Sequence, residues 1–214
     1  MKLILSRHGN TFDPNDPVVW AGSKNDFPLV AQGIEQAELF ADVLQFNGVA
    51  LDKIFCGPLQ RTVQYSSIII KKLCLNLQAQ IDFRLNEIDY GEWSGLTHLE
   101  VTQRFGQQVV HNWMEHSVWP ESGNWGSSER ALKQEVHAFV RDLIQTYRNN
   151  ETILVVTSNG RLRFFLSLIT EEWEKRKKCG TFKVKTGNIC KLVYIKNEFE
   201  LEYWNQKPTL SFVL

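Results

Sequence analysis

The chain has 214 residues, a length that suits one domain with a complete hydrophobic core. Lys and Arg together number 24, as do Asp and Glu, so the formal net charge is zero and no basic field favours nucleic acid as the main partner. Four widely spaced cysteines without a C-x-x-C pair predict neither a zinc site nor a disulfide framework. We expect a soluble cytoplasmic protein with reduced thiols and no membrane partner, because the apolar run at residues 3–5 is too short for a signal peptide or a membrane span.

The first half of the chain alternates apolar runs with helical patterns. Residues 9–28 between them are rich in Asn, Asp, Pro and Gly, which is typical of a loop, and a loop this long in a compact domain usually carries function. Val30 precedes the first helical pattern and cannot cap it. The elements expected in this half are strands at 2–6, 54–56 and 81–83 and helices at 31–46 and 59–73.

The second half contains two candidate helix starts and an aromatic segment. Thr97 is followed three residues later by Glu100, as in a capping box, and Ser127 is the second candidate cap. Residues 107–125 predict an insertion over the surface, whereas the charged residues 171–178 predict a helix end or a solvated turn. Further elements expected are a helix from Ser127 to Tyr147, a strand at 153–156, a helix to about residue 169 and a β-hairpin formed by 188–195 and 199–204.

Strands that alternate with helices predict an α/β protein, built as a three-layer α/β/α sandwich around a mostly parallel central sheet. In such sheets ligands bind at the carboxyl ends of the strands. The turns that follow the first, second and fourth strands contain Arg7 and His8, then Arg61, then Asn159 and Arg161. Guanidinium groups match the oxygens of a phosphate group, so these turns predict a phosphate pocket.

Four blocks of residues around these turns match the signature of one protein family. In chain order they are Arg7-His8-Gly9-Asn10-Thr11; Gly22, Asp26, Pro28, Leu29 and Gly33 with Gln36-Ala37; Leu59, Arg61, Thr62 and Gln64; and Leu85, Glu87, Asp89, Gly91, Glu92, Trp93 and Gly95. Together the blocks resemble the histidine phosphatase superfamily, in its phosphoglycerate mutase-like branch. One short motif would be weak evidence, but several in family order span most of the chain. The resemblance implies a single domain over residues 1–214, with a lid insertion around 107–125.

This resemblance implies a phosphatase that works through a phosphohistidine. His8 would attack phosphorus as a neutral imidazole, and Glu87 would protonate the leaving oxygen and then activate water. Arg7 and Arg61 would hold the equatorial oxygens of the transferred phosphoryl group. The other phosphate-binding residues implied are Thr11, Asn159, Gly160 and Arg161. No metal or other cofactor is expected, because cationic side chains supply the charge.

Asn159 is the main departure from the family pattern, which has a histidine at this position. Asparagine can donate a hydrogen bond to a phosphate oxygen but cannot become cationic. Losing one transition-state donor costs about 10²–10³ in rate, and Arg161 or Arg163 is a candidate to restore the charge. Two interpretations stay open: an active natural variant, or a damaged or engineered site that binds phosphorylated ligands with little turnover. Phosphoglycerate mutase activity is less expected, because mutases of this type carry a longer insertion and tail.

The aromatic insertion also has two interpretations. Trp113, Trp119 and Trp125 form either a satellite hydrophobic cluster or part of a lid that selects the substrate. We expect a small phosphorylated substrate as the partner, but the residues identify neither that substrate nor an oligomeric state. The other histidines are expected at the surface or on helices: His98, His111, His116 and His137.

Overall fold

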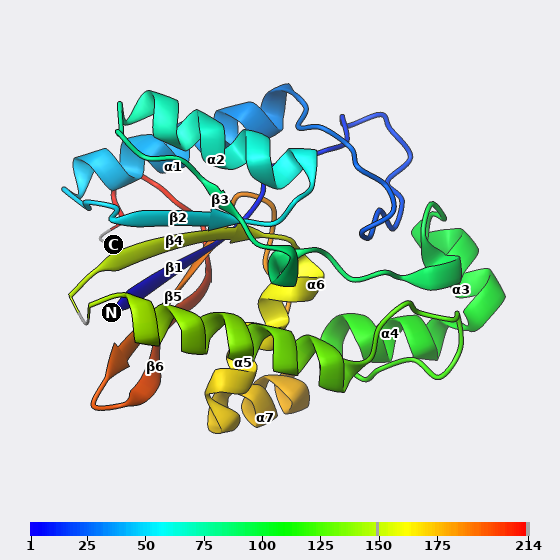
Figure 1. Cartoon of the computed structure of the whole chain (residues 1–214). Helices are drawn as coiled ribbons and strands as arrows, with labels where there is room; N and C mark the ends of the chain where they lie inside the picture. The colour runs from blue at the N-terminus through cyan, green and yellow to red at the C-terminus, as the bar shows by residue number, and fades with distance from the viewer. Residues whose placement is uncertain (149, 213–214) are drawn as a thin grey trace.

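The centre of the molecule is a six-stranded sheet (Figure 1). The structure is a computed structural model, and it describes residues 1–148 and 150–212. Across the sheet the strands follow the order β3 (Gln80–Ile81), β2 (Lys53–Cys56), β4 (Thr152–Thr157), β1 (Lys2–Arg7), β5 (Ile189–Ile195) and β6 (Glu198–Gln206). The first four run parallel to one another, while β5 and β6 add an antiparallel hairpin at one edge. The predicted mostly parallel sheet and the C-terminal hairpin are therefore confirmed.

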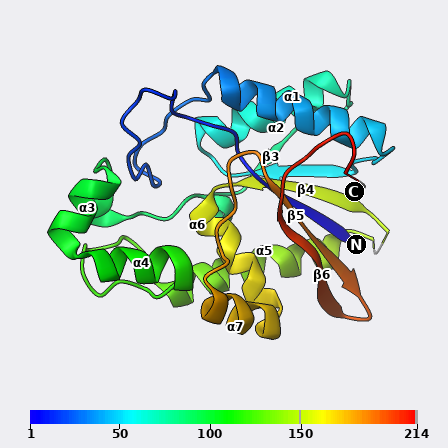
Figure 2. The ribbon, with the colours of Figure 1, turned by 180° about the vertical axis from the view of Figure 1, so that it is seen from behind.

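Helices cover both faces of this sheet, which confirms the predicted three-layer α/β/α sandwich (Figures 1 and 2). One face carries α1 (Ala31–Phe46) and α2 (Gln60–Lys72), which pack on each other. The opposite face carries α5 (Glu129–Thr146), α6 (Asn159–Leu162), a 3₁₀ helix (Arg163–Leu168) and α7 (Thr170–Cys179).

Two further helices extend the molecule beyond the ends of the parallel strands (Figure 1). They are α3 (His98–Phe105) and α4 (Gln107–His116), and two 3₁₀ turns at Phe83–Leu85 and Gly91–Trp93 precede them. Among the described residues no helix has both the length and the apolar character that a membrane crossing requires.

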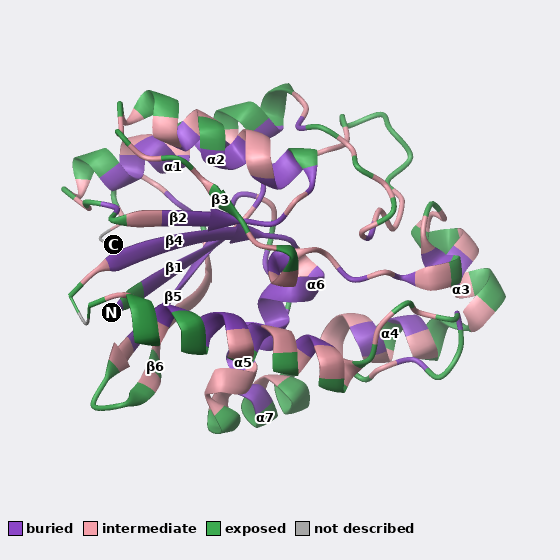
Figure 3. Ribbon diagram, viewed as in Figure 1, coloured by how far each residue is buried: buried purple, intermediate pink, exposed green. Residues whose placement is uncertain are grey.

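The parallel strands are apolar on both sides because helices bury both faces of the sheet. Along β1, Leu3 and Leu5 belong to the hydrophobic core that includes α5, whereas Ile4 belongs to the core that includes α1 and α2. All three side chains are at most 1% exposed. Fully burying one such side chain contributes about 1.5–3 kcal/mol. Alternate residues of β1 thus pack against the helices on opposite faces of the sheet. Figure 3 shows the buried strands between helices whose outer faces are exposed.

Strand register brings the ends of β1, β2 and β4 to one edge of the sheet. Arg7 at the end of β1 pairs with Thr157 at the end of β4, and Cys56 at the end of β2 pairs with Val156. The turns that follow these strands therefore leave the sheet next to one another. This is the arrangement on which the predicted phosphate pocket depends.

The helix starts agree with the sequence at two positions and differ at one. Thr97 and Glu100 form the predicted capping box, and Val30 begins α1 without a side-chain cap, as expected. The cap of α5 is Ser128, whose hydroxyl accepts the N–H of Ala131 at 3.2 Å, so the assignment to Ser127 is wrong by one residue. Two adjacent serines offer the same capping chemistry, which is why the sequence did not separate them.

The charged segment 171–178 forms most of the regular helix α7 rather than a solvated turn. Its acidic residues lie in the first turn and its basic residues in the last turn, which suits the helix dipole. Glu172 also forms ion pairs with Lys175 and Arg176, and Trp173 is buried on the inner face. Local ion pairs and the burial of one aromatic ring therefore stabilise a helix in a segment whose composition suggested a solvent-exposed turn.

The helix predicted after β4 is broken into two parts. α6 ends at Leu162, and residues Arg163–Leu168 continue as a tighter 3₁₀ helix. Every residue from Gly160 to Leu166 is buried in this region. Packing, rather than helix propensity, therefore determines the conformation of this stretch.

Candidate active site

A cavity of about 490 Å³ opens where β1, β2 and β4 end. Six residues predicted from the sequence line it, namely Arg7, His8, Thr11, Arg61, Glu87 and Asn159. The other walls come from residues between 10 and 22, from Tyr90, His98 and Met114, and from Lys183 and Thr186. A concave site that gathers charged groups from several distant segments is the expected place for ligand chemistry.

His8 presents an unprotonated ring nitrogen in this cavity. Its Nδ1 lies 2.7 Å from the carbonyl oxygen of Gly9, and only a protonated Nδ1 can donate to a carbonyl. The residue is 5% exposed, and burial together with the charges of Arg61 and Arg7 holds the pKa of His8 well below the usual 6.5. The ring is therefore neutral at physiological pH, and its proton is on Nδ1. Nε2 then carries the lone pair that a nucleophile needs.

Two guanidinium groups are fixed beside this histidine by backbone carbonyls. Arg7 Nη1 donates to Val184 at 2.7 Å, and Arg61 donates through Nη1 to Asn25 at 2.9 Å and through Nη2 to Gly22 at 2.8 Å. Among the described residues the buried Nε of Arg7 has no hydrogen-bond partner.

Burial lowers the pKa of both guanidinium groups, and the nearby Glu87 carboxylate opposes this effect. Arg7 and Arg61 therefore form a partly compensated cationic pair that lines a cavity. Guanidinium groups remain protonated in proteins, so the pair retains its positive charge. Such a pair favours a doubly charged ligand, such as a phosphate ester, over a neutral one.

Glu87 is positioned by two backbone N–H groups. Its Oε1 accepts from Ile88 at 2.8 Å, and its Oε2 accepts from Gly160 at 3.3 Å. A Cβ atom at Gly160 would overlap the carboxylate of Glu87 and the hydroxyl of Tyr90, so a side chain at this position would displace both groups. Gly160 thus lies behind Glu87 and supports it. Burial, with the Glu87 charge, raises the pKa of Tyr90, which keeps its hydroxyl a neutral donor.

Asn159 is the first residue of α6 and lines the cavity through a fixed amide group. Its Oδ1 accepts the backbone N–H of Val184 at 2.8 Å. Because only the oxygen of the amide can accept this bond, the assignment of Oδ1 and Nδ2 is unambiguous. The two N–H donors of Nδ2 therefore remain for other partners, which include a ligand.

A sequence model of the histidine phosphatase superfamily (branch 1) matches residues 3–207. The chain belongs to this superfamily. Its similarity to known members covers most of its length. It is 29% identical over 170 residues to the adenosylcobalamin/alpha-ribazole phosphatase of Escherichia coli strain K12, covering 78% of each chain. It is 28% identical over 169 residues to the 2,3-bisphosphoglycerate-dependent phosphoglycerate mutase of Afipia carboxidovorans, covering 78% of this chain and 80% of the mutase.

The fold of this superfamily member is also that of a solved structure. A mycobacterial glucosyl-3-phosphoglycerate phosphatase superposes with a TM-score of 0.80, covering 96% of this chain and 99% of the other at 19% identity. The family model and the similarity to the mutase confirm the phosphoglycerate mutase-like resemblance predicted from the four sequence blocks. The relatives include both a phosphatase and a mutase, so similarity alone does not select one activity.

Arg161 and Arg163 are not among the described residues that line this cavity. Arg161 is buried, donates from Nε to Asn86 at 2.8 Å and pairs with Glu135 at 2.6 Å. Arg163 is 2% exposed, donates to the carbonyl of Trp113 at 2.8 Å and lies 3.9 Å above its ring. Neither is among the described residues that line the cavity. The assignment of Arg161 to the phosphate group is therefore corrected: both guanidinium groups support the α5 and α4 side of the fold.

The segment 183–187 contributes two lining residues, Lys183 and Thr186, that the sequence did not reveal. The N–H of Gly187 donates to the carbonyl of His8 at 3.1 Å, and the Thr186 hydroxyl donates to the side chain of Asn10. Lys183 and Thr186 line the cavity. The only available signal was a short Lys-Val-Lys-Thr-Gly run before β5, which matched none of the sequence blocks. The role of this segment depends on contacts with residues far away in the sequence. Arg7, which donates to Val184, is 177 residues from it.

A group of apolar residues, here called the outer wall, lines part of the cavity beside polar residues such as Asn10, His98 and Lys183. It is formed by Phe12, Val18, Val19 and Trp20 from the long loop after β1, and by Met114 from α4. The loop is attached to the segment before α3, since Val19 and Thr97 form an isolated antiparallel bridge. The predicted functional loop is thus held against the start of α3, and both this loop and Met114 of the insertion line the cavity.

The three tryptophans of the insertion pack edge to face. The rings of Trp113 and Trp119 both contact Trp125, with centroids 4.8 Å apart in each pair. Trp125 also lies 4.8 Å from the ring of Tyr90, which borders the cavity. The rings therefore form an aromatic cluster, and its position beside Tyr90 links the insertion to the active-site loop.

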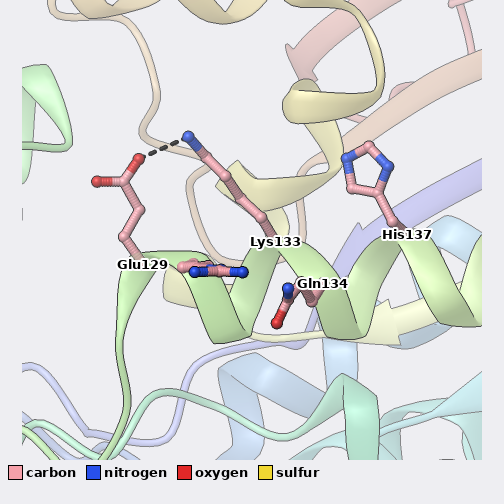
Figure 4. A pocket seen from close by; sticks show the side chains of 5 residues that line it. Glu129, Lys133, Gln134 and His137 are labelled. Atoms are coloured by element: carbon pink, nitrogen blue, oxygen red, sulfur yellow. Dashed lines mark ion pairs between the residues drawn. The ribbon is translucent and has the colours of Figure 1, made fainter.

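A separate hollow lies along the outer face of α5 (Figure 4). Glu129 and Lys133 there form an ion pair at 2.6 Å, and His137 Nε2 lies 3.0 Å from the hydroxyl of Ser167. That hydroxyl already donates to the carbonyl of Phe164 at 2.6 Å, so the histidine must be the donor to Ser167. A histidine that activates a serine must accept the hydroxyl proton, whereas His137 donates to Ser167. The hollow therefore offers no serine–histidine dyad.

Proposed function

We propose that this histidine phosphatase hydrolyses small phosphate monoesters through a phosphohistidine on His8, without a metal cofactor. The observation that carries the proposal is the unprotonated Nε2 of His8 in a cavity also lined by Arg7 and Arg61. A neutral imidazole beside two fixed cations favours in-line attack on phosphorus, because the cations hold the oxygens where charge is located in the transition state.

In the first step Nε2 of His8 forms a bond to phosphorus as the bond from phosphorus to the ester oxygen breaks. Glu87 supplies the proton that the departing alcohol needs. In the second step water attacks the phosphohistidine, Glu87 takes the proton from that water, and the phosphorus–nitrogen bond breaks to release phosphate. The contacts of Glu87 with Ile88 and Gly160 support this role because they fix the carboxylate at the cavity.

Hydrolysis is favoured over phosphoryl transfer to a sugar acid by the nature of the outer wall. Phe12, Val18, Trp20 and Met114 offer apolar surface to the alcohol part of the substrate. Apolar surface is a poor environment for a second carboxylate or phosphate, because a charge loses its hydration there. We therefore propose substrates whose alcohol carries an aromatic or aliphatic group.

A second candidate is a protein that binds phosphorylated ligands and turns them over slowly. Asn159 favours it, because a neutral amide stands where the family pattern has a histidine. The positions of His8, Arg7, Arg61 and Glu87 around one cavity favour catalysis instead.

Hydrolysis of p-nitrophenyl phosphate separates these two candidates. The purified wild-type protein should release p-nitrophenol at a steady rate, and His8→Ala should abolish that release. Turnover that survives in His8→Ala would remove His8 from the reaction. Tight binding of vanadate without measurable turnover by the wild-type protein would favour the slow ligand-binding candidate.

A further inference from the structure

Asn159 leaves this site one potential positive charge short of the family pattern. Arg161 and Arg163 are close in sequence but cannot restore it, because Arg161 is paired with Glu135 and Arg163 is buried against Trp113. If phosphoryl transfer proceeds as proposed, a further cation near Asn159 would compensate the charge on the phosphoryl oxygens.

Lys183 is the candidate for such a cation. It lines the same cavity as Asn159, and its side chain is exposed to solvent. The next residue, Val184, donates its N–H to Asn159 Oδ1 at 2.8 Å and accepts from Arg7 Nη1 at 2.7 Å. The peptide unit that joins Lys183 to Val184 therefore carries the N–H that fixes Asn159.

The local backbone turns this lysine away from the core. Phe182 and Val184 are buried, whereas Lys183 and Lys185 are exposed, which is the alternation of an extended chain. Of the two lysines, Lys183 borders the cavity. Within the described part of the chain neither ammonium group forms an ion pair. Figure 2 shows the orange stretch between α7 and β5, which contains both lysines, passing beside α6 on its way to the sheet.

We propose that Lys183 is a phosphate ligand of this site. Its ammonium group donates to the phosphoryl oxygen on the Asn159 side of the cavity and supplies the charge that Asn159 lacks. The inference rests on the proposed phosphate-ester chemistry at His8. A lysine is suited to this place because its charge is compact and its stem flexible, so it can follow phosphorus as it moves from the ester to the histidine.

Vanadate binding and p-nitrophenyl phosphate hydrolysis test this role together. The variants are Lys183→Met, which removes the charge but keeps an apolar stem, Lys183→Arg, which keeps the charge, and Lys185→Met as the matched control. We expect Lys183→Met to raise the vanadate Kd at least about tenfold and to lower kcat/KM by about 10–10². Lys183→Arg should stay close to the wild-type protein, and Lys185→Met should match it.

The same change in an Asn159→His background provides a second readout. A histidine that restores the charge should make Lys183 partly redundant, so Lys183→Met should cost less there than in the wild-type background. Equal vanadate affinities for Lys183→Met and Lys185→Met would overturn the inference. If the wild-type protein binds vanadate but does not hydrolyse the ester, the proposed hydrolysis fails while the vanadate comparison still decides the role of Lys183. A wild-type protein that does not bind vanadate would overturn both.

Discussion

The backbone N–H of Val184 donates to the side-chain oxygen of Asn159 over 2.8 Å, while the carbonyl oxygen of Val184 accepts from Arg7 over 2.7 Å. One residue outside the sequence blocks therefore orients two side chains of the cavity. Since the amide oxygen is occupied by Val184, Asn159 offers its N–H donors to other partners. At the position that the sequence resemblance assigns to the family's second histidine, Asn159 thus offers positioned N–H donors without a positive charge.

Replacing Asn159 by Asp tests this donor. Aspartate has nearly the same shape and can still accept from Val184, but it replaces the N–H donors by a negatively charged oxygen. We expect kcat/KM for p-nitrophenyl phosphate to fall by about 10²–10³, because a donor is lost and a repulsive charge is added. Asn159→His serves as the control and should retain activity or increase it. An Asn159→Asp protein as active as the wild type would show that the amide does not contact the phosphoryl group.

Replacing Glu87 by Gln tests proton transfer. We expect hydrolysis of an alkyl phosphate to fall by about 10²–10⁴, since an alkoxide leaves poorly without a proton. Hydrolysis of p-nitrophenyl phosphate should fall less, because p-nitrophenolate leaves without one. Steady-state rates for both esters with both proteins give the comparison. Equal losses on the two esters would assign Glu87 a role other than general acid.

The pH dependence of stability tests the environment of His8. Burial and the neighbouring arginines hold its pKa in the folded protein well below the usual 6.5, so below that pH the unfolded chain binds a proton that the folded protein does not. The free energy of unfolding should therefore decrease as the pH falls below about 6.5, by up to about 1.4 kcal/mol per pH unit for this one group. Denaturant titrations of the wild-type protein and of His8→Gln measure the difference. Identical slopes in the two proteins would contradict a buried neutral imidazole.

Replacing Val18 by Ser tests the apolar outer wall. Val18 lines the cavity and is 63% exposed, while Leu99 is 64% exposed on α3 and is not among the described lining residues, so Leu99→Ser is a matched control. Val18→Ser should raise KM for naphthyl phosphate about threefold, as expected for the loss of apolar contact area. KM for glycerol phosphate should change little. An equal effect of the two substitutions, or an equal effect on the two esters, would contradict an apolar substrate surface.

Much of the fold could be predicted because local patterns and tertiary packing agree. The helix over residues 31–46 and the capping box at Thr97 match the structure residue for residue. The helix after β4 was predicted, but its change to 3₁₀ geometry at Arg163 was not, because the packing of the buried residues 160–166 leaves no local sequence signal. The helical state of 171–178 likewise depends on ion pairs and on the burial of Trp173.

The residues of the candidate site also fall into two groups, those that could be predicted from the sequence and those that could not. Arg7, His8, Arg61 and Glu87 lie in turns with recognisable motifs, and the structure brings them to one cavity. Arg161 looked equivalent to them in sequence, but its partner Glu135 lies on a different helix and could not be identified from spacing. The contribution of residues 183–187 was also hidden, because all of its important contacts are with segments distant in sequence.

The measurement that tests the central claim most directly is trapping of the phosphoenzyme. The wild-type protein is mixed with p-nitrophenyl phosphate, quenched in base, which preserves phosphohistidine, and digested for mass spectrometry. The account predicts one phosphoryl group on the peptide that contains His8 and none in His8→Ala. A phosphoryl group on another residue, or steady turnover by the wild-type protein without any trapped phosphohistidine, would contradict it.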